Sequence, residues 1–188
     1  MSSHLATLGF SAKMPAYKLF SFKYLVLSVN HSNSHWTLII VTTEPYGMLS
    51  VHFYDPLSGR PYKTETELVW TSKLLPFVRI WYSARWSDGD YPFPSEVRDH
   101  WIATPKQPDG SSCGIMCLAM AYSYLHGNQG FERDTVTKDV VQVMRLRLLW
   151  VILCGSVIHP ISPEDEAAIE DTGKELISIF VKKSAKVW

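Results

Sequence analysis

Thr104-Pro-Lys-Gln-Pro-Asp-Gly-Ser-Ser-Cys-Gly-Ile-Met-Cys-Leu-Ala-Met-Ala-Tyr122 is the stretch of sequence that decides the fold. Its first part, through Ser112, consists of loop-forming residues, with two prolines, an Asp-Gly pair and two serines. From Cys113 onward the stretch is apolar and permits a helix. The pattern predicts a helix that begins at about Ser112 or Cys113, with Ser111 or Ser112 as its N-cap.

A cysteine in the first turn of a helix is a candidate nucleophile. Unpaired backbone N–H groups and the positive end of the helix dipole favour the thiolate there. The thiolate is the nucleophile of cysteine catalysis. On its own, however, Cys113 is explained at least as well as a small apolar residue that packs the end of a helix.

Length and composition indicate one folded domain that spans residues 1–188. The chain is 46% hydrophobic and 13% aromatic, which is typical of a folded domain and not of a disordered segment. Its formal net charge is zero, so nothing indicates a surface for nucleic acid or for an anionic membrane.

The N-terminus, the length of the apolar stretches and the cysteine count bear on where in the cell the protein is expected. The N-terminus lacks the basic start and continuous apolar run of a signal peptide, and no apolar stretch reaches membrane-spanning length. Three cysteines are too few, and odd in number, for a disulfide framework. We therefore expect an intracellular protein of a reducing compartment, the nucleus or the cytoplasm, and the sequence does not indicate its oligomeric state.

The chain in order reads as strands first and helices last, which indicates an α+β fold. Strands are expected at residues 24–29, 35–43, 49–54 and 97–103, and the apolar run of the second suggests a central position. A turn is expected at 45–47. Helices are expected at 64–75, where Pro76 interrupts the pattern, at 137–154 and at 163–183, and residues 77–86 are ambiguous.

Three polar residues could complete a cysteine site. His35 opens a strand and could serve as the base, while Asp55 ends the next strand and could orient that imidazole if the two strands form a hairpin. Gln107 lies six residues before Cys113, and its amide could donate to an oxyanion together with the Cys113 backbone N–H. Each of the three also has an ordinary structural explanation. His35 could be a strand-end histidine that bonds a loop, Asp55 part of an Asp-Pro turn, and Gln107 a solvated loop residue.

A zinc site is a weaker interpretation of the same region. Cys113 and Cys117 are four residues apart, as are His31 and His35. The two histidines span a turn-to-strand junction, so they do not share a helix face. We expect neither a metal nor another cofactor.

With these residues in place, the chain resembles the adenain and SUMO-protease superfamily of cysteine peptidases. The resemblance rests on His35-Trp36 opening a strand, Asp55 ending the next, and Gln107-Pro-Asp-Gly-Ser-Ser-Cys113-Gly114 opening a helix. Residues 113–122 and 143–149 also resemble the family's central and later helices. It covers about residues 24–154.

The resemblance implies both a fold and a mechanism. The fold would be cysteine-peptidase-like, with a small mixed sheet packed between the helix that carries the nucleophile and the C-terminal helices. Cys113 would attack a carbonyl, His35 would move the proton and Asp55 would orient His35. Gln107 would stabilise the oxyanion. Trp36 would match the family tryptophan that packs on the glycine-glycine tail of a ubiquitin-like modifier, although a strand tryptophan is as often part of a core.

Two departures bear on specificity. Ser112 stands where the family usually has an aspartate, and only 34 residues, none of them tryptophan, precede His35. The domain is thus expected to have the family's N-terminal portion shortened or missing, with Trp81 and Trp86 as candidates to close the channel over the tail.

The expected function is a thiol protease or isopeptidase that cleaves after glycine in ubiquitin-like modifier precursors or conjugates. A ubiquitin-like modifier or its conjugate is then the expected partner. Two alternatives stay open: a catalytically degenerate module that binds such a modifier, and an acyltransferase that uses the same triad.

Overall fold

The structure is a computed structural model that describes residues 14–44, 48–127 and 136–154, with residues 171, 174, 175 and 178. A short 3₁₀ turn, η1, precedes the first strand. Within the described ranges the elements run in this order: η1 Leu19–Ser21, β1 Tyr24–His31, β2 His35–Glu44, β3 Met48–Tyr54, α2 Arg60–Val69, a π-helical turn Trp70–Leu74, α3 Leu75–Arg85, β4 Arg98–Ile102, α4 Cys113–Leu125 and α5 Lys138–Cys154.

The four described strands form one mixed sheet in the order β1-β2-β3-β4. The first three are antiparallel, whereas β4 pairs parallel to β3. Strand β2 pairs on both sides, and seven of its ten residues are buried, which confirms the predicted central position. The tight β1–β2 turn places Ser32 and Asn33 at φ 51° and 60°. This is the left-handed region, which few residues other than glycine adopt and which asparagine tolerates best in turns.

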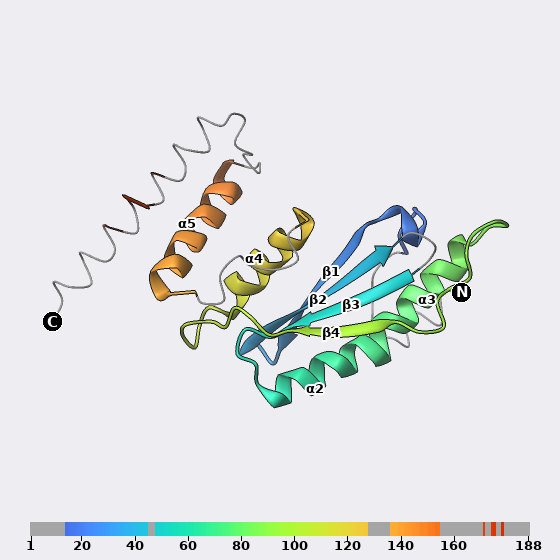
Figure 1. The fold of residues 1–188 in the computed structure, drawn as a ribbon, viewed down its shortest axis with the longest axis horizontal. Helices are drawn as coiled ribbons and strands as arrows, with labels where there is room; N and C mark the ends of the chain where they lie inside the picture. Colours follow the sequence, from blue (N-terminus) through green and yellow to red (C-terminus); the bar gives the residue numbers. More distant parts are fainter. Residues whose placement is uncertain are drawn as a thin grey trace.

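Helices cover both faces of the sheet (Figure 1), and the α+β expectation is confirmed. One buried cluster joins the sheet to α2, the π-helical turn and α3, and a second joins the other face to α4 and α5. The expected arrangement needs one correction. The layer opposite α4 consists of α2 and α3, because their aromatic and aliphatic side chains cover that face, whereas α5 packs beside α4 through Val141.

Pro76 does not interrupt the helical path, contrary to expectation, and helix α2 begins at Arg60 instead of residue 64. The chain stays helical through residue 85 because a π-helical turn precedes the proline. In that turn the Leu75 N–H donates to the Trp70 carbonyl, five residues back. Pro76 then lies in the first turn of α3, where its missing N–H is not required.

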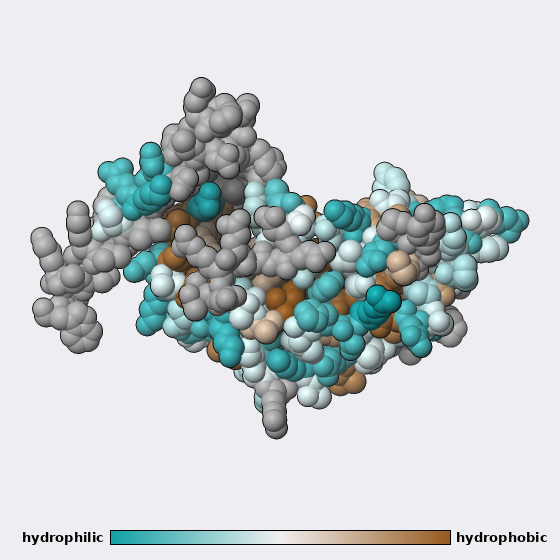
Figure 2. Space-filling model, viewed as in Figure 1, coloured by the Kyte–Doolittle hydropathy of each residue, from teal (hydrophilic) through white to brown (hydrophobic). Residues whose placement is uncertain are grey.

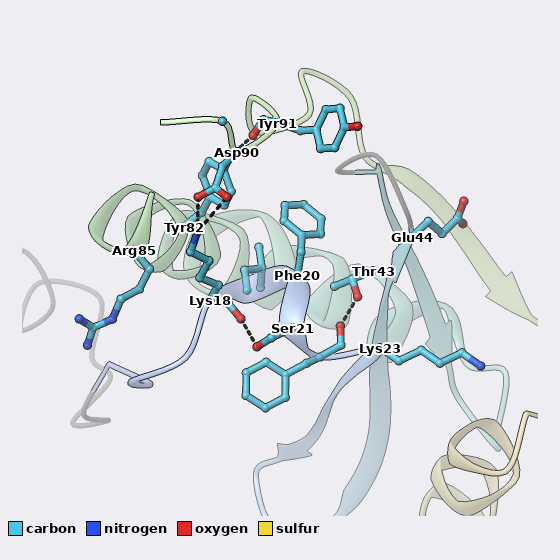
Figure 3. A pocket seen from close by; sticks show the side chains of 13 residues that line it. Lys18, Phe20, Ser21, Lys23, Thr43, Glu44, Tyr82, Arg85, Asp90 and Tyr91 are labelled. Atoms are coloured by element: carbon cyan, nitrogen blue, oxygen red, sulfur yellow. Dashed lines mark hydrogen bonds and ion pairs between the residues drawn. The ribbon is translucent and has the colours of Figure 1, made fainter. Parts of the chain in front are cut away.

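The segment before β1 is fastened to α3 and to the loop that follows it (Figure 3). The Lys18 ammonium donates to Ser87 Oγ at 2.5 Å and to the Asp90 carboxylate at 2.9 Å, beside a pocket of about 640 Å³. Trp81 is 3% exposed, and its indole N–H donates to the Tyr17 carbonyl at 2.9 Å. Trp81 is therefore excluded as a candidate to close a substrate channel, because its side chain belongs to the core. Trp86, the other candidate, is 50% exposed.

Figure 2 shows hydrophobic residues over the middle of the molecule and hydrophilic ones at its right-hand end. Helix α4 contributes an exposed apolar stripe of Leu118, Tyr122 and Leu125, opposite the face that it buries on the sheet. No helix of the described ranges is long and apolar enough to cross a membrane. The turn expected at 45–47 lies outside the described residues, as does most of the helix expected at 163–183.

A histidine pair on the sheet predicts a pH dependence of stability. His52 on β3 is in register with His100 on β4, with ring centroids 6.0 Å apart, and its Nδ1 is buried without a partner among the described residues. Tyr124 lies on the same ring at 5.4 Å. Burial lowers the pKa of His52 and the charge of His100 lowers it further, whereas Glu44 acts in the opposite direction.

Because the folded-state pKa lies below the unfolded value of about 6.5, the unfolded chain takes up this proton first as the pH falls. The free energy of unfolding should therefore fall as the pH drops through that value. Urea midpoints at pH 7.5 and 5.5 measure this loss, which His52→Gln should reduce. His126→Gln, at the exposed end of α4, is the control. An equal pH dependence in the wild type and the His52 variant would contradict the prediction.

Candidate active site

His35 and Asp55 meet at one end of the β2–β3 hairpin. The hairpin pairs Leu38 with Tyr54, so His35, which opens β2, and Asp55, which follows β3, reach the same end of the two strands. The His35 Nε2 and Asp55 Oδ1 atoms are 2.8 Å apart, and the two side chains are 2% and 0% exposed. The structure thus brings together the two residues that the sequence placed at neighbouring strand ends.

The Asp55 carboxylate accepts two further hydrogen bonds. The Leu57 N–H donates to Oδ1 at 2.9 Å, and the Gly59 N–H donates to Oδ2 at 2.8 Å. Gly59 is the N-cap residue of α2, so the carboxylate lies at the positive end of that helix. The two interpretations of Asp55, a turn residue and a partner of His35, therefore hold at the same time.

These contacts assign the two ring nitrogens of His35. A carboxylate only accepts hydrogen bonds, so we assign Nε2 as the protonated nitrogen that donates to Asp55. In the neutral ring the remaining nitrogen, Nδ1, is then an acceptor. This tautomer is the one that a proton-accepting imidazole requires.

The first turn of α4 lies against the start of β2. Cys117 Sγ donates to the Trp36 carbonyl at 3.4 Å, and a Cβ added at Gly114 would lie 3.7 Å from Trp36 Cδ1. Cys113 opens the helix and is 6% exposed. The neighbours of Cys113 and His35 are thus in contact, whereas the described contacts include no hydrogen bond between their own side chains.

The helix begins at the predicted position but is capped differently. Ser112 is the N-cap residue, yet its hydroxyl makes no capping hydrogen bond. It donates instead to Asp109 Oδ1 at 2.6 Å, and the Ser111 N–H donates to the same oxygen at 2.8 Å. The hydrogen bond from Ser112, followed by that from Ser111, lowers the pKa of Asp109. Asp109 therefore fixes the approach to Cys113, a role that the Asp-Gly turn signal could have indicated.

The loop that carries Gln107 is tied to the end of β3. The Gln107 N–H donates to the Pro56 carbonyl at 2.9 Å, and the Tyr54 hydroxyl donates to the Pro105 carbonyl at 2.7 Å. Gln107 is thus tied to the residue that follows Asp55. Its side-chain Nε2 donates to the Asp109 carbonyl, and its Oε1 is buried without a partner among the described residues.

Alternation along β2 separates His35 from Trp36. His35 points to the face covered by α2, because successive strand residues point to opposite faces. Trp36 points to the face covered by α4, and its indole is 39% exposed beside Gly114. Trp36 is therefore a surface residue at the tip of the helix and not a core aromatic.

Comparison with known proteins identifies the family. The family model described as the Ulp1 protease family, C-terminal catalytic domain, matches residues 9–149. The chain belongs to the Ulp1 protease family. No curated protein matches the sequence.

Solved structures of Ulp1 share the fold. The SUMO protease Ulp1 with its catalytic cysteine oxidized to a sulfonic acid matches at a TM-score of 0.51 and 19% identity, over 74% of this chain and 56% of that one. The Ulp1 protease domain in complex with Smt3, the yeast orthologue of SUMO, matches at 0.50 and 19%, over 73% and 55%. The present chain thus spans little more than half the length of these Ulp1 structures.

Two buried groups next to this candidate site are held in their neutral forms. Burial raises the pKa of the Cys117 thiol, and the nearby Cys113 and Asp55 raise it further. Burial likewise raises the pKa of the Tyr54 hydroxyl. Cys117 is therefore a poor nucleophile, and Tyr54 keeps the proton that it donates to the Gln107 loop.

We expect Asp55→Ala to lower the free energy of unfolding by about 3 kcal/mol, because it leaves a buried imidazole and two backbone N–H groups without their acceptor. Urea denaturation at pH 7 measures the loss. Asp88→Ala, at an exposed loop position, is the control and should change stability by no more than about 0.5 kcal/mol. A loss no larger than that of the control would show that the carboxylate does not hold this corner together.

Proposed function

We propose that this protein is a thiol protease that cleaves the bond after a glycine at the tail of a ubiquitin-like modifier. Cys113 is the nucleophile, His35 the base, Asp55 the residue that orients His35, and Gln107 an oxyanion donor. Family membership and the buried contact between His35 and Asp55 support this assignment. The observation that carries it is the packing of the first turn of α4 on the strand end that bears His35.

The reaction begins with a proton transfer from the Cys113 thiol to the His35 imidazole. With Nε2 bonded to Asp55, the proton is accepted at Nδ1. The thiolate attacks the glycine carbonyl, and the imidazolium then protonates the leaving amine. Water, deprotonated by the same imidazole, hydrolyses the thioester and releases the free glycine carboxylate.

Two donors near Cys113 would stabilise the oxyanion of each tetrahedral intermediate. One is the backbone N–H of Cys113, because this residue opens α4 and its N–H has no acceptor within the helix. The other is the Gln107 amide. Its Nε2 carries two hydrogens, of which one is used by the Asp109 carbonyl.

Trp36 would supply the wall that selects glycine. Its indole is partly exposed at the tip of α4 and lies in van der Waals range of a side chain added at Gly114. A flat ring beside a nucleophile leaves a narrow channel, and a tail without side chains fits into it. The Ulp1 structure in complex with Smt3 makes SUMO the first modifier to test.

A SUMO or ubiquitin derivative with a C-terminal vinyl sulfone should label Cys113 covalently, because the probe places an electrophile where the scissile carbonyl would lie. Mass spectrometry after proteolysis identifies the labelled residue. Cys113→Ala should abolish labelling. Cys117→Ala is the matched control, since its thiol is buried and neutral, and this variant should label as the wild type does.

The outcome of labelling also separates the alternatives. A folded protein that alkylates with iodoacetamide but reacts with no modifier probe would exclude the protease assignment. Tight modifier binding without labelling, unchanged in Cys113→Ala, would indicate a binding module instead.

We expect Trp36→Ala to lower kcat/KM for a modifier substrate about 30-fold, mainly through KM, because truncating a central interface tryptophan costs about 2 kcal/mol or more. Tyr17→Ala removes another exposed aromatic ring, in the segment before β1, and is the control. Steady-state hydrolysis of a C-terminal fluorogenic SUMO derivative measures both variants. Equal effects of the two substitutions would remove Trp36 from the substrate channel.

A further inference from the structure

Three aromatic rings from different elements lie together beside the strand end that carries Asp55. The Tyr62 ring, from the first turns of α2, has its centroid 4.3 Å from that of His35. The His31 ring, from the end of β1, is stacked on His35 at 6.1 Å and 26°, and it lies 5.3 Å from Tyr62. Each ring thus contacts the other two, and neither Tyr62 nor His31 belongs to the proposed reacting set.

A chain of hydrogen bonds fixes the protons on His31. The Thr66 hydroxyl donates to the Tyr62 carbonyl at 2.6 Å, so it can only accept from the Thr37 hydroxyl, 2.8 Å away. The Thr37 hydroxyl has then used its proton and accepts from His31 Nε2 at 2.9 Å. His31 Nε2 is therefore a donor.

The second nitrogen of His31 contacts α2. His31 Nδ1 lies 2.6 Å from Glu65 Oε2, with side chains that are 4% and 59% exposed. This contact fastens α2 to the end of β1 and holds the plane of the His31 ring that stacks on His35.

Gly59 makes room for Tyr62 over the site. A Cβ at this position would lie 3.2 Å from Tyr62 Cδ2 and 3.9 Å from Asp55 Oδ2. The same residue donates its N–H to Asp55. The backbone at Gly59 therefore fixes two groups around His35: the Asp55 carboxylate, which bonds Nε2, and the Tyr62 ring, which packs on the imidazole.

We propose that Tyr62 and the His31–Glu65 pair are positioning residues for His35, which they hold in the plane that keeps Nε2 on Asp55 and leaves Nδ1 to accept the proton. The inference rests on the proposed function, in which His35 accepts the proton of Cys113. A single hydrogen bond to Asp55 leaves the imidazole free to rock about that bond. A ring packed on its face removes this freedom and preorganises the base.

The first test replaces the packed ring. Tyr62→Leu keeps an apolar side chain but removes the ring, and it should lower kcat for a modifier substrate about tenfold with KM changed less than about twofold. Tyr62→Phe should restore kcat, because the Tyr62 hydroxyl makes no hydrogen bond to a described residue. Equal kcat values for wild type and Tyr62→Leu would overturn the role of the ring.

The second test uses two identical substitutions on one helix. Glu65→Gln replaces the carboxylate that contacts His31 Nδ1 with a neutral amide, which should hold the His31 ring less firmly and lower kcat several-fold. Glu67→Gln is the matched control, since Glu67 bonds the Trp101 indole at 2.8 Å on another part of α2, and it should leave kcat unchanged. Both side chains are exposed, so neither change is expected to unfold the protein. Equal kcat values in the two variants would overturn the role of the His31–Glu65 pair.

A readout that needs no turnover keeps this proposal separate from the protease assignment. In ¹⁵N-histidine-labelled protein, the Nε2–H of His35 bonded to Asp55 should give a protected proton resonance, which His35→Gln identifies by its loss. Tyr62→Leu and Glu65→Gln should shift or broaden this resonance, whereas Tyr62→Phe and Glu67→Gln should not. If the wild type cleaves no modifier, the protease proposal fails. The resonance then still decides the positioning proposal, and an unchanged resonance in both test variants would overturn it.

Discussion

The hydrogen bond between His35 and Asp55 is the constraint on which the rest of the site depends. A carboxylate that is fully removed from water is costly to bury unless its oxygens are satisfied. Here the imidazole and two backbone N–H groups satisfy them. Those donors come from the start of β2 and from the turn into α2, so satisfying one carboxylate requires both segments to converge on the end of β3.

The same strand end also separates the two faces of the site. The twofold alternation of a β-strand points His35 toward α2 and Trp36 toward α4. A register shift of one residue along β2 would exchange them and place the imidazole beneath α4, away from Asp55. The hydrogen bonds of His35 with Asp55 and of Thr37 with Thr66 on α2 hold the observed register and thereby the division between the two faces.

The sequence was sufficient wherever a local rule decides the structure. The apolar run after His35 predicted a central strand, and the change from loop formers to apolar residues predicted a helix at Cys113. It was incomplete where a neighbouring contact or the tertiary packing decides. The Ser112 hydroxyl donates to the Asp109 carboxylate three residues earlier, and residues 77–85, which the pattern left ambiguous, are helical and cover a sheet face. The expected interruption at Pro76 was wrong, because a π-helical turn precedes the proline and places it in the first turn of α3.

The residues of one motif can therefore indicate a kind of chemistry without determining how firmly each side chain is held. His35, Asp55, Gln107 and Cys113 come from four separate segments, and each is held by neighbours that the motif does not contain. Asp109 holds the approach to Cys113, the Tyr54 hydroxyl ties the Gln107 loop to β3, and helix α2 contacts His35 through Tyr62. Helix α2 has no sequence signal for this role, because a tyrosine one turn into a helix is ordinary until the strand ends are known. The orientation of the imidazole is thus a property of the packed layers, and a chain with the same four residues on a different α2 would retain the reactive groups but hold His35 less firmly.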